Sequence, residues 1–461
     1  MLCADVGSTY TKVTAVDVTS GELVAAADHP TTVDSDVLDG LDAAVAALGE
    51  RFRDAPVRAG SSAGGGLRLA VVGYESLVTA EAGHRVGLSA GAKVVHVAAG
   101  RLDTAEVTAL RDARPDIVLL VGGTDGGDDE ALRHNAGALA ASRLRTPIVL
   151  AGNDDAREDL TELLRARGRP VLPAENVLPR IGELNPVGAR TAIRDVFLRH
   201  VIGGKKLSKG RRFTRLVRGA TPDVVLTAVE LLADTGHSNV VVIDVGGATT
   251  DVYSVLSPDP EHQAPKQVAG TLWRSRTVEA DLGMRWSATG VVAAAATECL
   301  LSPGEADTLY AAAERRVAHP DLVPDNDVDT AIDNRLAQLA ITIALRRHAR
   351  GERIGPATGP RRSGKDLRQV TLVVGSGGVL RHGGNVPAAA LLRAAVADHP
   401  GGWPLPINPR YTVDRRYVLA AAGLLTEDQP LAARALLARE FGVRSGDTPG
   451  TTRRTRGPVS R

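Results

Sequence analysis

At 461 residues the chain is longer than one hydrophobic core usually organises, so two or three domains are expected. A formal net charge of +1 and an aromatic content of 3% give no support to nucleic acid or an anionic membrane as a partner. The two cysteines, Cys3 and Cys299, exclude a disulfide scaffold or a four-thiolate zinc site within one chain and fit a reducing compartment.

The start of the chain is typical of a core strand and not of a secretory leader. Its apolar run ends at Asp5, and no basic residue precedes that run. No stretch approaches the ~18 uncharged apolar residues that a membrane span needs. We therefore expect a soluble, cytoplasmic protein.

Three short apolar runs open the chain, with turn residues between them. They lie at Leu2–Val6, Lys12–Val18 and Glu22–Ala27, which predicts an antiparallel three-strand meander. An amphipathic helix is expected around Ser35–Arg53.

The opening of this pattern returns later in the chain. The Asp-Val-Gly of residues 5–7 recurs at residues 244–246, and at the same offset Thr11 falls on Thr250. Strand-like runs follow in the same order, at Val240–Val245, Asp251–Leu256 and near Gln267–Leu272. The repetition predicts two duplicated lobes.

A different rhythm separates the two copies. Strand-like runs about 20 to 30 residues apart alternate with helical stretches, which is βαβ spacing for a parallel, doubly wound, Rossmann-like sheet. The runs are Leu69–Val72, Val94–Ala98, Ile117–Val121, Ile148–Leu150 and Val171–Leu172, with helices at Ser76–Val86 and Ala156–Ala166. A Gly-rich loop, residues 122–127, follows one strand and is either a ligand loop or a helix cap.

Residues 5–12, Asp-Val-Gly-Ser-Thr-Tyr-Thr-Lys, form the first candidate site because they join two strands of a hairpin. Glycine lets backbone amides come close to phosphate oxygens, and hydroxyl groups add donors. Asp5 is a candidate to hold Mg²⁺ through water and to serve catalysis. A plain Gly-Ser turn is the alternative. The candidate cofactor-binding residues are Gly7, Ser8, Thr9, Thr11 and Lys12.

The second candidate site follows the buried run Val240–Val245, which delivers Asp244 to a Gly-Gly turn. Asp244 or Asp251 is a candidate to orient a water toward a γ-phosphate or to hold the metal. The loop matches neither the P-loop nor the dinucleotide-binding pattern. The candidate cofactor-binding residues here are Gly246, Gly247, Thr249 and Thr250.

A third strand ends in glycines at Gly375, Ser376, Gly377 and Gly378, with a helix expected from Pro387. Such a turn lets an adenine and its ribose lie flat against the backbone. These four residues are therefore candidates to bind a nucleoside.

Two Asp-x-Gly loops about half a chain apart, followed by a strand and a Gly-Ser-Gly-Gly turn, resemble the phosphate-1, phosphate-2 and adenosine motifs of the actin/Hsp70/sugar-kinase superfamily. The resemblance implies an α/β fold of duplicated, ribonuclease H-like ATPase lobes that bind ATP with Mg²⁺. Thr221-Pro222-Asp223 and the small-residue stretch Val418–Leu425 after Asp414 resemble the two connecting helices. Several hydrolysing relatives carry an acidic residue where Thr221 stands, so only slow hydrolysis is expected.

Within that superfamily the chain resembles the glutamate mutase accessory family, called MutL or GlmL, which shares only a name with the mismatch-repair protein. The segments that carry the resemblance are residues 5–12, 122–127, 151–156, 242–254 and 277–285, and the match runs nearly the whole length. It implies an ATP-dependent, chaperone-like reactivating factor that exchanges damaged cobalamin in a coenzyme-B12-dependent mutase. A mutase subunit is the implied partner, and a homo-oligomer stays open.

The expected domains are a first ATPase lobe in residues 1–70 and 176–235, the second part including a connecting helix, and a second lobe in residues 236–425. Residues 71–175 form the inserted Rossmann-like unit, and residues 426–461 a C-terminal helix with a disordered basic tail.

Three other functions stay open. A small-molecule kinase or hydantoinase-like enzyme of the same fold needs a carboxylate base, for which Asp251 is a candidate. An iron–sulfur activator of a dehydratase has a similar first loop, but its cluster needs cysteines at a dimer interface, whereas Cys3 lies in a core strand. A filament or pilus scaffold is the non-enzymatic alternative.

Overall fold

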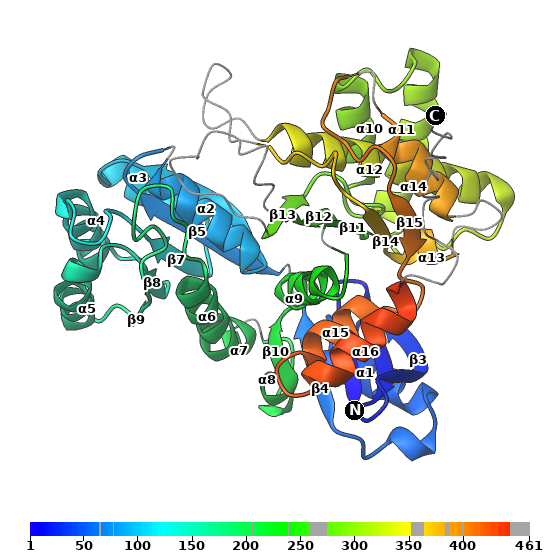
Figure 1. Ribbon diagram of the computed structural model, residues 1–461, viewed down its shortest axis with the longest axis horizontal. Helices are drawn as coiled ribbons and strands as arrows, with labels where there is room; N and C mark the ends of the chain where they lie inside the picture. The colour runs from blue at the N-terminus through cyan, green and yellow to red at the C-terminus, as the bar shows by residue number, and fades with distance from the viewer. Residues whose placement is uncertain are drawn as a thin grey trace, which may run out of the picture.

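Three five-stranded sheets organise the chain, and helices pack on them (Figure 1). The computed structural model describes residues 1–63, 66–76, 78–204, 206–237, 239–257, 274–351, 364–382, 388–398 and 401–442. The predicted strand near Gln267–Leu272, the predicted helix start at Pro387 and the predicted basic tail lie outside these residues.

The sheet of the first lobe has the strand order β10-β4-β1-β2-β3. Strands β1, β2 and β3 form the predicted antiparallel meander, whereas β4 and β10 run parallel to β1. The elements of this lobe are β1 (Leu2–Val6), β2 (Tyr10–Asp17), β3 (Glu22–Pro30), α1 (Val37–Ala47), a 3-10 turn (Glu50–Phe52), β4 (Val57–Ser61), α7 (Ile202–Gly204), α8 (Arg212–Leu216) and β10 (Val217–Ala220).

The sheet of the second lobe repeats this topology as β13-β12-β11-β14-β15. Its first hairpin even keeps the register, because Asp5 pairs with Lys12 in β1–β2 and Asp244 pairs with Asp251 in β11–β12. The predicted duplication and the actin-like fold are confirmed. The elements are β11 (Val240–Val245), β12 (Thr250–Val255), β13 (Arg274–Glu279), α10 (Ala288–Thr297), α11 (Pro303–Ala318), α12 (Asp327–Arg350), β14 (Leu372–Ser376), α13 (Gly378–His382), α14 (Ala388–Val396) and β15 (Arg410–Val413).

The inserted sheet is parallel throughout, in the order β6-β5-β7-β8-β9, so the predicted doubly wound insert is confirmed. Helices cover both of its faces, which explains why its strands are almost wholly apolar. The elements are β5 (Leu67–Gly73), α2 (Thr79–Ser89), β6 (Ala92–Ala99), α3 (Thr104–Asp112), β7 (Ile117–Leu120), α4 (Glu130–Ala141), β8 (Ile148–Leu150), a 3-10 turn (Asp154–Ala156), α5 (Arg157–Ala166), β9 (Val171–Pro173), α6 (Val187–Val196) and a π-helix (Phe197–Val201).

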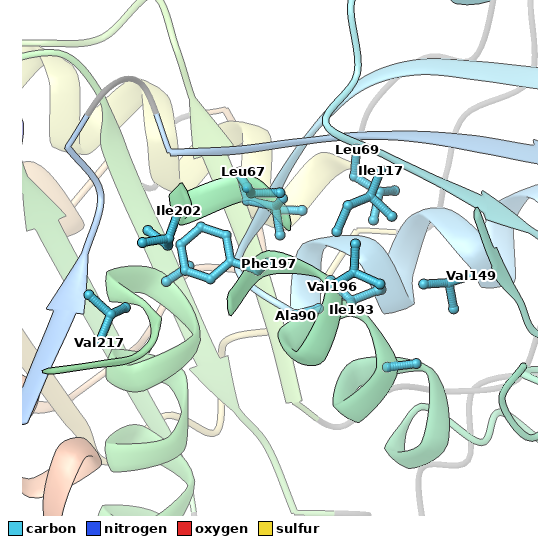
Figure 2. Close-up of a cluster of buried hydrophobic side chains, with 14 of the residues drawn as sticks. Leu67, Leu69, Ala90, Ile117, Val149, Ile193, Val196, Phe197, Ile202 and Val217 are labelled. Atoms are coloured by element: carbon cyan, nitrogen blue, oxygen red, sulfur yellow. The ribbon is translucent and has the colours of Figure 1, made fainter. Parts of the chain in front are cut away.

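The insert and the first lobe share one hydrophobic core. Leu69 and Ile117 of the insert sheet pack in the same cluster as Ile193 of α6 and Phe197 of the π-helix, and Val217 of β10 continues it into the first lobe (Figure 2). An apolar core is close-packed and transmits displacements. The insert is therefore joined firmly to the first lobe through α6.

Three helices lie between the two lobes: α9 (Thr221–Asp234), α15 (Val418–Leu425) and α16 (Pro430–Phe441) (Figure 1). Their core holds Cys3 from the first sheet and Val240 and Tyr253 from the second. Both predicted connecting helices are present, and they cross closely, since a Cβ on Gly423 of α15 would overlap the carbonyl oxygen of Val224 in α9. Among the described residues, every helix is too short or too polar to cross a lipid bilayer.

A buried carboxylate begins α15. Both oxygens of Asp414 accept backbone amides, from Val418 at 2.8 Å and from Leu419 at 3.0 Å. Burial raises the pKa of Asp414 to about 6, although these two hydrogen bonds lower it. The second connecting helix is thus capped by an acid that binds its proton unusually well.

We predict that Gly423→Ala weakens the helix crossing. The new methyl group must push α15 away from α9, and such overpacking costs about 1–3 kcal/mol of the free energy of unfolding. The matched control is Gly137→Ala in α4, where a Cβ meets nothing within 4 Å and the same change should stabilise the helix by about 0.5–1 kcal/mol. Calorimetric melting of both variants checks this, and an unchanged melting temperature for Gly423→Ala contradicts it.

Asp414 also predicts a pH dependence of stability. Because the pKa of Asp414 rises from 3.8 in the unfolded chain to about 6 in the folded one, its contribution to stability is complete below pH 4 and is lost as the pH rises through 6. The loss is at most about 3 kcal/mol. Asp414→Asn should remove this slope between pH 4 and 6, as measured by melting temperatures across that range. Parallel pH curves for the two proteins would count against the assignment.

Candidate functional site

Strand alternation directs one acidic residue of each lobe toward the space between the lobes. In β1, Leu2, Ala4 and Val6 point into the core of the first lobe, so Asp5 lies on the opposite face. In β11, the same alternation puts Asp244 on the face that Val240 and Val242 share with the connecting helices. Both carboxylates thus lie at the ends of their strands, on the faces that the two sheets turn toward the connecting helices. We call this region between the lobes the cleft.

Asp5 is held by one hydroxyl group and one cation. The hydroxyl of Thr221, at the start of α9, donates to Asp5 at 2.7 Å, and the Lys12 Nζ lies 3.6 Å from the other carboxylate oxygen. Burial alone would lower the pKa of Lys12, but Asp5, Tyr417 and Asp244 raise it to about 12. Lys12 is therefore a permanent cation in the cleft.

Thr221 occupies the position where the superfamily comparison expected an acid. Asp223, two residues later, instead accepts a hydrogen bond from Arg194 of α6 at 2.7 Å. The only carboxylate that Thr221 contacts through its side chain in the described residues is Asp5.

Asp244 lies in a row of polar side chains across the second sheet. Strand pairing puts Asp251 of β12 on one side of it and Ser376 of β14 on the other. Burial raises the pKa of Asp244, Lys12 opposes that shift, and Asp251 adds to it. Asp251 itself is paired with the buried guanidinium of Arg276 at 2.7 Å and accepts the Thr249 hydroxyl at 3.1 Å.

A segment that sequence reasoning could not interpret supports the second glycine loop. The amides of Met284 and Arg285 donate to the carbonyl oxygens of Gly246 and Gly247, at 3.0 and 2.8 Å. The Ser287 hydroxyl donates to the carbonyl of Ala248 at 2.9 Å. Residues 282–287 therefore form a backing that fixes the loop through its carbonyl groups.

The two glycine loops carry backbone amides without an acceptor among the described residues. Within the described residues, no hydrogen-bond acceptor contacts the amides of Ser8 and Thr9 in the first loop, or those of residues 247–249 in the second. A Cβ on Gly247 would stand 3.2 Å from the Thr9 hydroxyl, so the loops face each other directly. Unpaired loop amides of this kind bind anionic oxygens.

Two predicted ligands do not reach the cleft. Thr11 and Thr250 are fully buried on the opposite strand face, toward the lobe cores. The Thr11 hydroxyl lies 3.0 Å from that of Thr31, and the Thr250 hydroxyl donates to the carbonyl of Leu282 at 2.5 Å. Their hydroxyl groups position the loops from behind.

The third glycine turn lies against the second loop. Gly377 has φ of +108°, and a Cβ there would overlap the carbonyl oxygen of Val245. Ser376 hydrogen-bonds Asp244, and Gly378 begins α13. Only glycine fits this approach of two backbones, so the turn joins the third motif to the phosphate loops.

Sequence reasoning missed two residues of the cleft, Arg381 and Tyr417. Two cations lie over the Tyr417 ring, the Lys12 Nζ at 4.2 Å and the Arg381 guanidinium at 3.7 Å from its centre. Tyr417 directly precedes the predicted helix Val418–Leu425, and Arg381 follows the third glycine turn. Their closeness in sequence to these motifs is the one feature that could have indicated a place in the site.

The Gly-rich loop of the insert is held by asparagines. Asn176 donates to the carbonyl of Gly123 and to Asp125, and Asn153 donates to the carbonyl of Gly127. Asp128 accepts the amide of Glu130 at 2.8 Å. These contacts favour the helix-cap interpretation of residues 122–127.

Comparison with known proteins identifies relatives. The family model described as MutL protein matches residues 1–441. Protein MutL of Clostridium tetanomorphum is 36% identical over 449 residues, covering 93% of this chain and 96% of its own length. Among solved structures, the ethanolamine utilization protein EutJ from Carboxydothermus hydrogenoformans is 10% identical over 95% of this chain and 89% of its own, with a TM-score of 0.30. Component A of the (R)-2-hydroxyglutaryl-CoA dehydratase of Acidaminococcus fermentans is 11% identical over 94% and 98%, with a TM-score of 0.28. From the family model and the sequence relative, the chain belongs to the MutL protein family.

Proposed function

We propose that this chain binds ATP with Mg²⁺ between its two lobes and acts as an accessory, reactivating factor for a coenzyme-B12-dependent mutase. Nucleotide binding is supported by the pair of facing glycine loops. Each loop follows a carboxylate, Asp5 or Asp244, and each has backbone amides without an acceptor in the described part of the chain. The accessory role rests on membership of the MutL family and on the resemblance to glutamate mutase accessory proteins.

Each cleft residue has a part in this proposal. Asp5 and Asp244 would hold Mg²⁺ through its water shell, since Mg²⁺ prefers oxygen ligands and releases water reluctantly. Lys12 would balance the phosphate charge, and Thr221 fixes the Asp5 carboxylate through its 2.7 Å hydrogen bond. Mg²⁺ supplies charge neutralisation of the phosphates when it is bound.

The proposed division of labour follows the expected domains. The two lobes clamp the nucleotide, and the inserted parallel sheet with its helices faces the mutase. We place this accessory function in the cytoplasm. A nucleotide shifts a conformation only as far as its affinities for the two states differ, so the lobes and the insert must move together for ATP to act on a partner.

The site gives no support to a kinase or to an iron–sulfur activator. Asp251, the candidate base of a kinase, already has its Oδ1 occupied by the guanidinium of Arg276 at 2.7 Å. Burial raises the pKa of the Cys3 thiol to about 12, which opposes the thiolate that an iron–sulfur cluster needs.

Asp244→Asn tests the metal role. Calorimetry should find that the wild type binds ADP at least 10-fold more tightly with Mg²⁺ than in EDTA, and that this ratio falls toward one in the variant, because an amide is a weaker Mg²⁺ ligand than a carboxylate. The control is Asp307→Asn on the exposed face of α11, which should keep the wild-type ratio. A wild type that binds neither ATP nor ADP would overturn the nucleotide proposal.

The partner is tested by recovery from the native cell. The tagged chain should retain a mutase subunit, identified by peptide mass and by cobalamin absorbance, and should release it when ATP and Mg²⁺ are added. The tagged Asp244→Asn variant should retain the same subunit but release it poorly, since its nucleotide response is weakened. Recovery that never includes a cobalamin enzyme contradicts the reactivating role.

A further inference from the structure

Tyr417 has a backbone conformation that its side chain does not favour. Its φ of 55° and ψ of 38° are left-handed, and it is the residue just before α15. For a bulky residue such a conformation costs about 1–3 kcal/mol and persists only where the surroundings enforce it. This backbone strain lies between the cleft and the connecting helix α15, so the contacts of the Tyr417 ring must stabilise it.

The contacts come from both lobes. Lys12 belongs to β2 of the first lobe and Arg381 to α13 of the second, and both cations lie on the Tyr417 ring, at 4.2 and 3.7 Å. Arg381 is held in place by its Nε, which donates to the carbonyl of Arg415 at 2.6 Å. Each cation–π contact contributes about 0.5–2 kcal/mol, which together is enough to offset the backbone strain.

The ring therefore bridges the two lobes by using cations that a polyphosphate would also attract. Charge-assisted hydrogen bonds to phosphate are stronger than contacts with an aromatic face, and one cation cannot satisfy both fully. The Lys12 Nζ already lies at the mouth of the first glycine loop through its contact with Asp5. A nucleotide tail in the loops would compete directly for Lys12.

We propose that Tyr417 is a latch on the nucleotide cleft: its ring holds Lys12 and Arg381, and the phosphates of a bound nucleotide draw these cations away from the ring. This inference rests on the proposed nucleotide binding. Release of the ring frees Tyr417 from its left-handed conformation. Because the next residue, Val418, starts α15 on the Asp414 cap, the release acts on the helix that crosses α9 at Gly423.

The competing role for Tyr417 is a stacking surface for the adenine base, and it predicts the opposite effect of removing the ring. A latch opposes binding, so its loss tightens binding. A stacking surface favours binding, so its loss weakens binding.

The test is Tyr417→Leu, with the affinity for ADP and Mg²⁺ measured by calorimetry and the melting temperature measured without nucleotide. The latch predicts an affinity about 3- to 30-fold higher and a lower nucleotide-free melting temperature, because one or two cation–π contacts no longer have to be broken on binding. Tyr417→Phe keeps the ring and should behave as the wild type.

Two further variants make the result decisive. Tyr411 lies on β15, outside the glycine loops, and its ring centre is 5.2 Å from the guanidinium of Arg393. Tyr411→Leu should therefore lower the melting temperature without changing the affinity for ADP. Tyr417→Asn removes the ring with a residue that tolerates left-handed geometry, so it repeats the experiment if the Leu variant folds poorly. Equal or weaker ADP binding by the ring-free variants, beside a wild type that binds, overturns the latch alone. A wild type that binds no nucleotide overturns the proposed function and the latch with it.

Discussion

The close crossing of α9 and α15 is the constraint on which the cleft depends. Gly423 lets the second helix approach the backbone of Val224, and the two sheets pack on either side of this pair through one shared core. The strand faces that enter this core end in Asp5 and Asp244. A wider crossing would therefore separate the two carboxylates, even though neither of them contacts Gly423. The site is fixed by helix packing first and by its own hydrogen bonds second.

Duplication supplies a symmetric frame, but equivalent positions carry opposite charges. Lys12 lies opposite Asp5 in the first hairpin, whereas Asp251 lies opposite Asp244 in the second. Lys12 stays in the cleft and stabilises the carboxylates by its charge. Asp251 is instead neutralised by Arg276, whose guanidinium also donates to the carbonyl of Ala92 in the insert at 3.4 Å. The same pseudo-symmetric position thus carries a cation between the lobes in one case and an acid tied to the insert through Arg276 in the other.

Local sequence predicted much of this arrangement. Continuous apolar runs between turn residues gave the exact limits of Leu2–Val6, Val240–Val245 and Ile148–Leu150, and the small-residue run gave α15. The alternation of side chains along a strand would have shown that Thr11 and Thr250 face the lobe cores. Each directly precedes a residue, Lys12 or Asp251, whose side chain lies on the opposite face of its strand. The backing segment of residues 282–287 and the ring of Tyr417 were out of reach, because their roles depend on partners tens to hundreds of residues away.

Under the proposed nucleotide binding, the side chains beside Asp5 favour a conformational switch over a fast hydrolase. Thr221 orients Asp5 but adds no carboxylate to activate water, and the nearby acid, Asp223, is bound to Arg194. That ion pair ties α9 to α6, which shares its core with the insert (Figure 2). The insert is thereby linked to the first connecting helix through α6 and to the second lobe through Arg276. A movement of the lobes that repacks α9 against α15 would therefore be passed to the insert through the Asp223–Arg194 ion pair.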